Sequence, residues 1–291
     1  MKTKNLIERL SLFLLALVLT MPAWAQGGSG NESETITIAS KEDWKAFCDR
    51  VNKGQTTLNA KLTKDVDLGE EIVMAGTLDP NSPGYDLLCY TGTFDGQGHT
   101  LSFNWNAGKD NQIAPFWCVK DATIKNLRTQ GKITKKGYGL SGMVYIASGT
   151  TTISGCISDV DITGGNSGLA SSNAAGMVQA VAYGASVQIT DCLVKGSITD
   201  NADEDYRRMA GFVFSNSGTY TLTRCLYVGK NNAPNDKYSY TFGTENGSTF
   251  TDCYYLNTCG KAQGDKITEA QLRNGYVAYK LQKGIESQVW G

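Results

Sequence analysis

Apolar and polar residues alternate in short runs along most of the chain. Between about residues 57 and 256, runs rich in Ile, Val, Thr, Leu and Tyr are separated by turns rich in Gly, Asn, Asp and Ser. Such alternation places the apolar residues on one face of a β-strand, and no convincing helical period interrupts it. The pattern therefore predicts a long series of strands that each bury one face.

The strands recur at a regular interval. The segments LSGMVYIA, AAGMVQAV and MAGFVFSN align on Gly142, Gly176 and Gly211, which are 34 and 35 residues apart. A period of this length, made of strands alone, is typical of a solenoid, in which each unit buries its apolar face against its neighbours. We therefore expect an all-β fold with parallel β-helix repeats over 57–265.

A cysteine ends the same β-prone segment in four repeats. TISGC, QITDC, TLTRC and TFTDC end at Cys156, Cys192, Cys225 and Cys253, and ATIKNL has Leu127 at that position. Equivalent positions of stacked coils lie about 4.8 Å apart, which favours a column of buried free thiols. At least one disulfide in the column is an alternative, although parallel side chains hold the Cβ atoms slightly too far apart. A metal site is disfavoured because the chain has no CxxC pair.

The first 25 residues have the pattern of a signal peptide. A basic start precedes an apolar run over 10–19, and Ala-Trp-Ala stands before Gln26 as a cleavage site. The apolar run is too short to span a bilayer comfortably. We expect a flexible linker over 26–35, a secreted or outer cell-surface protein, and no transmembrane segment in the mature chain. Export would also permit a disulfide between Cys89 and Cys118 or between Cys253 and Cys259.

Helical patterns stand at both ends of the strand region. Over 36–56 we expect a strand and then a capping helix, in which Ser40 and Asp43 have capping-box spacing and Gly54 ends the helix. Over 266–291 we expect one further helix, with Thr268 and Gln271 at capping-box spacing. Helices here would cover the unpaired strands of the terminal coils. The apolar Val-Trp near the end suggests that sequence is missing downstream.

The charge balance excludes one class of partner. The chain has 27 Lys and Arg against 28 Asp and Glu, and removal of residues 1–25 leaves 24 against 27, a net charge of −3. A nucleic-acid-binding protein normally carries a basic patch, and none is present. We expect no nucleic-acid partner.

His99 is the only histidine of the chain. It follows Asp95 in TFDGQGHTL, where the two side chains could form an acid/base pair. The favoured interpretation is that both bond the backbone of a glycine-rich turn. A second histidine and a GxSxG elbow are missing, which argues against a serine or cysteine hydrolase and a histidine zinc site.

Carboxylates and aromatic residues supply the other candidates for chemistry. Clustered acids could bind Ca²⁺ or act on a glycosidic bond, although a solvated insertion between two coils is favoured for the second group. The two groups are Asp159 and Asp161 in SDVDI, and Asp200, Asp203, Glu204 and Asp205 in TDNADEDYRR. Aromatic side chains could stack on sugars, but filling of the core is favoured. They include Trp105, Trp117, Tyr227, Tyr238, Tyr240, Tyr254 and Tyr255.

The segments FDGQGHTLSF, ATIKNL, GMV, GFV, TISGC and QITDC together resemble GLUG-type repeat proteins. The opening DWKAFCDRVNKG and the close TEAQLRNGYVAYKL are similar to the same group, so the resemblance covers roughly residues 36–290. Such proteins are exported surface proteins, frequent in Gram-negative gut bacteria, and their repeats also occur beside IgA-specific metalloproteases. The resemblance implies a right-handed parallel β-helix with an adhesin-like or scaffold role, and it carries over no catalytic residues.

We therefore expect a non-enzymatic, adhesin-like surface module that binds host glycan or protein or acts as a scaffold, without a cofactor or metal. The alternative is a β-helix polysaccharide lyase or glycoside hydrolase that uses the clustered carboxylates. A third hypothesis is a purely architectural stalk. An enzyme should show carboxylates converging in one groove, a binding module should show an exposed aromatic or Asn/Asp strip, and a stalk should show neither.

Overall fold

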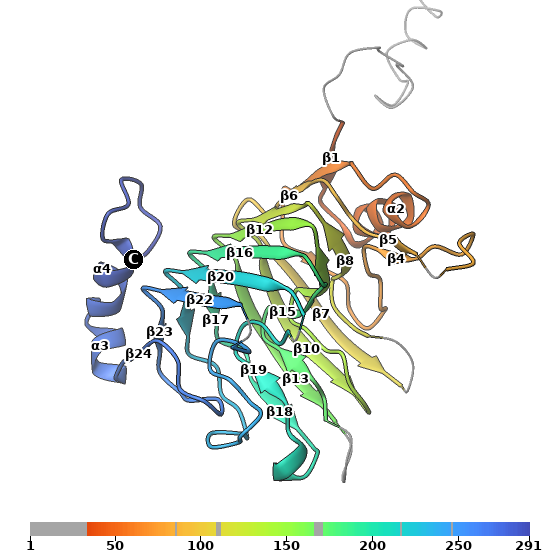
Figure 1. Ribbon diagram of the computed structural model, residues 1–291. Helices are drawn as coiled ribbons and strands as arrows, with labels where there is room; N and C mark the ends of the chain where they lie inside the picture. Colours follow the sequence, from red (N-terminus) through yellow and green to blue (C-terminus); the bar gives the residue numbers. More distant parts are fainter. Residues whose placement is uncertain (1–33, 85, 109–111, 166–170, 216, 246) are drawn as a thin grey trace, which may run out of the picture. The chain divides into compact units, whose positions relative to one another are not determined.

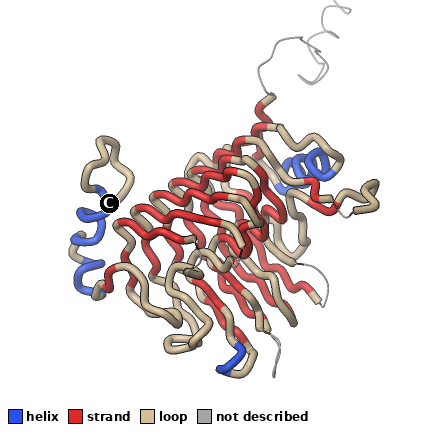
Figure 2. Tube along the Cα trace, in the orientation of Figure 1, coloured by secondary structure: helices blue, strands red, loops and turns tan. Residues whose placement is uncertain are grey.

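The strands stack in successive coils, as Figure 2 shows in red. The computed structural model describes residues 34–84, 86–108, 112–165, 171–215, 217–245 and 247–291. The expected signal peptide and residues 26–33 of the expected linker lie outside these ranges. Each coil runs through three faces, here called sheets A, B and C, before the next coil begins.

Sheet A contains one strand from each of eight coils. Equivalent residues pair in parallel register, so that Ile153 lies between Ile124 and Ile189 and all three are buried. In spatial order the strands are β1 (Thr35–Ile38), β2 (Asn59–Leu62), β6 (Thr93–Asp95), β9 (Thr123–Lys125), β12 (Thr150–Ser154), β16 (Ser186–Thr190), β20 (Thr219–Thr223) and β22 (Ser248–Thr251).

Sheet B follows sheet A in each coil, and sheet C completes the circuit (Figure 1). The strands of sheet B are β3 (Val66–Asp67), β7 (Thr100–Ala107), β10 (Arg128–Lys135), β13 (Ile157–Gly164) with β18 (Ile198–Asp200) beside it, β17 (Leu193–Val194), β21 (Leu226–Tyr227), β23 (Tyr254–Tyr255) and β24 (Asp265–Lys266). Sheet C consists of β8 (Phe116–Lys120), β11 (Val144–Ser148) and β15 (Val178–Val181), and β14 (Ala174–Ala175) pairs with β19 (Met209–Ala210). Every strand pair in the described residues is parallel except the hairpin of β4 (Thr77–Leu78) and β5 (Leu87–Leu88). The expected parallel β-helix is confirmed.

A left-handed residue forms the corner between sheets A and B in successive coils. The backbone φ is 51° at Asn126, 60° at Gly155, 56° at Asp191, 52° at Arg224 and 50° at Asp252. Gly, Asn and Asp tolerate this conformation better than other residues do. The corner turns the following residue inward, and that residue is Leu127 in one coil and a cysteine in the next four.

A second column, of glycines, lies where the chain enters sheet C. A Cβ atom on Gly142 would overlap the carbonyl oxygen of Gly176, and one on Gly176 would overlap that of Gly211. The backbones of these coils therefore approach more closely than any side chain allows. The empty positions face a column of sheet B side chains that grows from coil to coil: Ser158, Val194 and Tyr227.

The helix α2 (Lys41–Asn52) has the predicted cap and packing face. Ser40 Oγ accepts a hydrogen bond from Asp43 N at 3.1 Å, and the Asp43 carboxylate accepts one from Ala39 N at 2.9 Å. These bonds satisfy backbone donors that the first turn leaves free. The predicted apolar face is buried: Trp44, Phe47, Cys48 and Val51.

The stretch expected to be helical at the C-terminal end is divided into two short helices. The chain forms α3 (Glu269–Arg273) and α4 (Tyr276–Gln282), because Gly275 between them has φ 79°. The capping box of Thr268 and Gln271 is present. Both helices lie beside the last strands of sheet B (Figure 1). The buried side chains of this contact are Leu226, Tyr254, Ile267, Val277 and Leu281.

Candidate functional site

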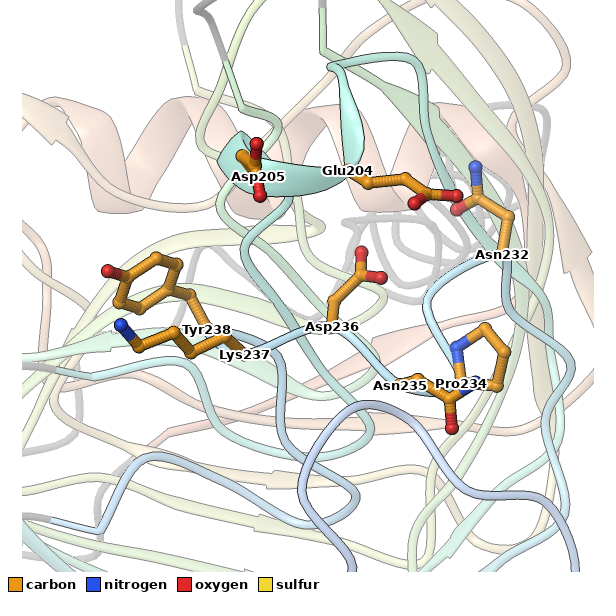
Figure 3. Close-up of a pocket in the computed structure, with 8 residues that line it drawn as sticks. All are labelled: Glu204, Asp205, Asn232, Pro234, Asn235, Asp236, Lys237 and Tyr238. Atoms are coloured by element: carbon orange, nitrogen blue, oxygen red, sulfur yellow. The ribbon is translucent and has the colours of Figure 1, made fainter.

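A hollow of about 510 Å³ opens between two loops that follow sheet B in adjacent coils (Figure 3). One loop includes the 3₁₀-helix η2 (Glu204–Tyr206), and the other spans residues 228–239. We call this the first hollow. It is lined by Glu204, Asp205, Asn232, Pro234, Asn235, Asp236, Lys237 and Tyr238.

Asp200 holds the first of these loops in place. Its side chain is fully buried and accepts hydrogen bonds from Ser171 Oγ at 2.8 Å, Ser172 N at 2.9 Å and Ala202 N at 2.9 Å. Asn232 joins the loop of the next coil to it, because its side chain exchanges two hydrogen bonds with the Asp200 backbone, at 3.0 and 2.9 Å. The sequence led us to expect Asp200 in a solvated insertion. Its side chain is instead buried and anchors both loops.

Asp236 lies at the centre of the first hollow, between Glu204 and Tyr238 in Figure 3. Its side chain is 9% exposed, and Oδ2 is buried without a hydrogen-bond partner. Burial raises the pKa of Asp236, and the charge of Glu204 adds to that rise, whereas Arg207 opposes it. The Arg207 guanidinium lies 3.8 Å from Oδ2 and is held by the carbonyls of Ala202 and Asn232.

An exposed aromatic ring forms one side of the first hollow. Tyr238 is 39% exposed, and the Arg208 guanidinium and the Lys237 ammonium each lie 5.1 Å from its ring centroid. Cations at this distance are attracted to the face of the ring and fix its orientation. A polar ligand in the first hollow would therefore meet a positioned ring beside carboxylate and amide groups.

A second hollow, of about 590 Å³, adjoins the first one and shares Pro234 and Asn235 with it. Its walls come from the ends of three strands of sheet B and from α3. The other lining residues are Val228, Lys230, Asn231, Leu256, Asn257, Thr258, Lys266 and Glu269. The two hollows together form one polar groove on either side of the Pro234–Asn235 turn, which we call the loop groove.

The structure divides the predicted carboxylates among different environments. Asp203 and Asp205 are exposed on the loop around η2, and only Asp205 lines the first hollow. Asp159 pairs with Lys195 at 2.8 Å on the outer face of β13. Asp161, on the same face, accepts hydrogen bonds from Ser197 N and Oγ at 2.9 and 2.6 Å. Neither Asp159 nor Asp161 lines the loop groove.

Asp95 and His99 lie at a turn of an early coil. Burial opposes ionisation of Asp95, but hydrogen bonds from Gln97 N and the Asn126 side chain hold its pKa below the usual value. The His99 backbone N donates to Gly96 O at 2.8 Å, and Nδ1 lies 3.4 Å from a carboxylate oxygen of Asp65. The Asp95 side chain thus bonds the turn backbone, whereas the His99 side chain faces Asp65 and only the His99 backbone bonds the turn.

The four repeat cysteines are buried and unbridged. The sulfur of Cys192 lies 3.2 Å from Thr190 O, and Cys156 N points at it from 3.4 Å. Burial raises the pKa of the Cys192 and Cys225 thiols well above the usual value. The disulfide in the described residues joins Cys89 to Cys118 and ties the chain after β5 to β8. Cys259 is a buried free thiol.

Sequence reasoning missed Asp236 and the two lysines of the second hollow. The stretch KNNAPNDKY (230–238) is polar, contains a proline, and occupies the place in its coil that TDNADEDYRR occupies in the preceding one. An alignment of these two loops would have indicated that they are neighbours in adjacent coils. In the described ranges no cluster of three or more His, Cys, Asp or Glu could hold a metal ion. No helix in the described part of the chain is long and apolar enough to cross a membrane.

The fold and the groove define a parallel β-helix protein with a polar site on its loops. No protein-family model matches the sequence, and a search of the curated proteins finds no relative. Among solved structures, the chain is similar to a Bacteroides ovatus protein named "putative immunoglobulin A1 protease", with a TM-score of 0.53 and 12% identity over 87% of this chain and 89% of the other. At this identity the similarity shows the fold alone.

Proposed function

We propose that this protein is an exported, non-enzymatic β-helix module that binds a host glycan, free or on a surface protein, in the loop groove. The observation that carries the proposal is the loop groove itself. It combines an exposed, positioned tyrosine ring with carboxylates and the Asn235 amide on loops that a buried carboxylate anchors. Sugars present hydroxyl groups to polar side chains and apolar ring faces to aromatic ones.

Proteolysis by the zinc mechanism of the HExxH class has no support in this chain. That mechanism needs two histidines one helical turn apart as metal ligands, and His99 is the only histidine in the sequence. The name of the structural neighbour therefore does not supply an activity for this protein.

Substitution of Tyr238 tests the proposal. The purified protein is screened on a glycan array and on mucin, and the best ligand is titrated against the wild type and Tyr238→Ala. Loss of the ring should weaken binding on the order of tenfold, because an aromatic contact contributes about 1–2 kcal/mol. Tyr183→Ala is the matched control, since Tyr183 is 93% exposed and lies outside the loop groove. Equal affinity for wild type and Tyr238→Ala would place binding elsewhere.

A second function, hydrolysis of a glycan, is favoured by Asp236. A carboxylic acid with a raised pKa beside other carboxylates is the arrangement that general acid catalysis at a glycosidic bond uses. Release of reducing sugars and unsaturated products is measured on a polysaccharide panel, with and without Ca²⁺. Turnover that Asp236→Asn abolishes would replace the binding function by this one.

A further inference from the structure

We propose that the second hollow binds a single acidic group of the glycan, a carboxylate or a sulfate, while the first hollow binds the uncharged sugar beside it. This inference rests on the function proposed above and specifies the class of ligand. It is carried by the shape of the second hollow and by the opposite charges of the two hollows.

The walls of the second hollow are fixed by amide side chains. Asn231 Nδ2 donates a hydrogen bond to Thr258 O at 3.0 Å, and Asn257 Nδ2 donates one to Gly229 O at 3.0 Å. These bonds run in both directions between the loops of two adjacent coils. The second hollow is therefore formed before a ligand arrives, which limits the entropy that binding costs.

The second hollow carries a positive charge that the protein does not neutralise. Lys230 follows β21 and Lys266 lies in β24, and both are exposed. Within the described residues neither lysine has a carboxylate at ion-pair distance, and the one acid of the lining, Glu269, pairs with Arg273. Two ammonium groups over a preformed polar hollow favour an anion.

The first hollow has the opposite character. Three of its lining residues are acids, Glu204, Asp205 and Asp236, whereas Lys237 in the lining and Arg207 beside Asp236 are basic, which leaves one negative charge in excess. Carboxylates accept hydrogen bonds from sugar hydroxyls but repel a second anion. A polymer with an acid on every sugar would place an anion in both hollows. The pair of hollows therefore selects an oligosaccharide that ends in one acidic group.

The experiment compares 3′-sialyllactose with lactose, which lacks the acidic sugar, and with heparin as a uniformly charged polymer. Binding to the purified protein is followed by ligand-observed NMR and calorimetry at 20 mM and 500 mM NaCl. We expect sialyllactose to bind on the order of tenfold more tightly than lactose at low salt, and the difference to shrink at high salt, because salt screens exposed charges. Heparin should bind more weakly than sialyllactose per site.

Two double variants assign the effect to the second hollow. Lys230→Ala with Lys266→Ala should remove the preference, so that sialyllactose binds no more tightly than lactose does to the same variant. Lys64→Ala with Lys136→Ala removes the same charge from exposed positions outside the loop groove and should keep the preference. Lys230→Glu with Lys266→Glu should reverse the preference, which a general loss of structure would not do.

The outcomes separate this inference from the function on which it rests. Equal binding of lactose and sialyllactose, or a preference that survives loss of both lysines, overturns the acidic-group site and leaves glycan binding standing. Preferred binding of heparin overturns the single-acid specificity. If no glycan binds on the array or in solution, the proposed function and this inference both fall.

Discussion

One residue in each of five successive coils, at the corner between sheets A and B, is held at a φ of 50–60°. Such a conformation costs roughly 1–2 kcal/mol for a residue other than Gly, Asn or Asp. Arg224 is the member of this column that is not Gly, Asn or Asp. It forms two hydrogen bonds of 2.7 Å to the Asp191 carboxylate, which holds the same position one coil earlier. A partly buried, bidentate ion pair thus offsets local backbone strain.

Substitutions at Arg224 separate the ion pair from the strain. Arg224→Ala should lower the free energy of unfolding by about 1–2 kcal/mol, because it removes the pair and keeps the strained φ. Arg224→Gly should cost less, because glycine adopts this φ freely. Urea denaturation measures both, with Lys195→Ala as the control, since the more accessible, single-contact Lys195–Asp159 pair should contribute under about 1 kcal/mol. An equal loss for Arg224→Ala and Arg224→Gly would show that the corner is unstrained.

Among the elements, the two short C-terminal helices cover apolar side chains that sheet B presents outward. Leu226 and Tyr254 begin β21 and β23 and pack against Val277 and Leu281, whereas the next residue of each strand points into the solenoid. The last coils of sheet B would otherwise expose this apolar surface. The two helices therefore cover the outer face of sheet B, whereas the apolar face of α2 packs into the main core.

Truncation of one buried side chain in α4 measures this contribution. Leu281→Ala should lower the free energy of unfolding by about 2–4 kcal/mol, because Leu281 is completely buried. Tyr279→Ala lies in the same helix at a 71% exposed position and should change stability by under about 0.5 kcal/mol. Urea denaturation at a fixed protein concentration compares the two. Similar midpoints for both variants would mean that α4 does not stabilise the coils.

The sequence pattern was sufficient to predict the strands and the helix α2, but it was not sufficient to predict the loop groove. Strand period, repeat length and the Ser40 cap depend on neighbouring residues, so the solenoid and α2 could be predicted. The break at Gly275 was also visible as Asn-Gly, but the apolar period across it favoured one helix. The loop groove brings together residues about 30 positions apart, and its shape depends on the conformations of two loops. These conformations depend on the burial of Asp200. That burial could not be predicted, because Asp200 lies in a sequence segment rich in acids that has the composition of an exposed loop.

For the molecule as a whole, several buried thiols and phenols keep their protons to a higher pH in the folded state than in the unfolded chain. Burial raises the pKa of the Cys192 and Cys225 thiols, raises the pKa of Tyr220 to about 12, and raises those of Tyr90 and Tyr227 as well. In the unfolded chain a thiol has a pKa of about 8.5 and a phenol has a pKa of about 10. The folded state therefore binds more protons than the unfolded state above pH 8.5, and its stability must fall there.

Thermal unfolding between pH 7 and 11 tests this expectation. The melting temperature should be flat up to about pH 8.5, decline as thiols of the unfolded chain ionise, and decline more steeply above about pH 10. Cys192→Ala with Cys225→Ala should start from a lower melting temperature and lose only part of the first decline, because burial also raises the pKa values of Cys48 and Cys259. Measurements without oxygen or added reductant keep the Cys89–Cys118 bridge intact. A melting temperature that stays constant from pH 8 to 10 in the wild type would contradict the buried thiol column.

The glycine column has a consequence for how this gene can change. Each empty position faces a side chain that follows 16 or 18 residues later in the same coil: Ser158 for Gly142, Val194 for Gly176 and Tyr227 for Gly211. Tandem repeats invite unequal crossing-over, which duplicates or deletes whole units. Here a duplicated coil would carry its glycine together with the side chain that fills the space beside it. We therefore expect this column to permit changes in the number of coils but to resist substitution of a single glycine, because a Cβ there would overlap the backbone of the next coil.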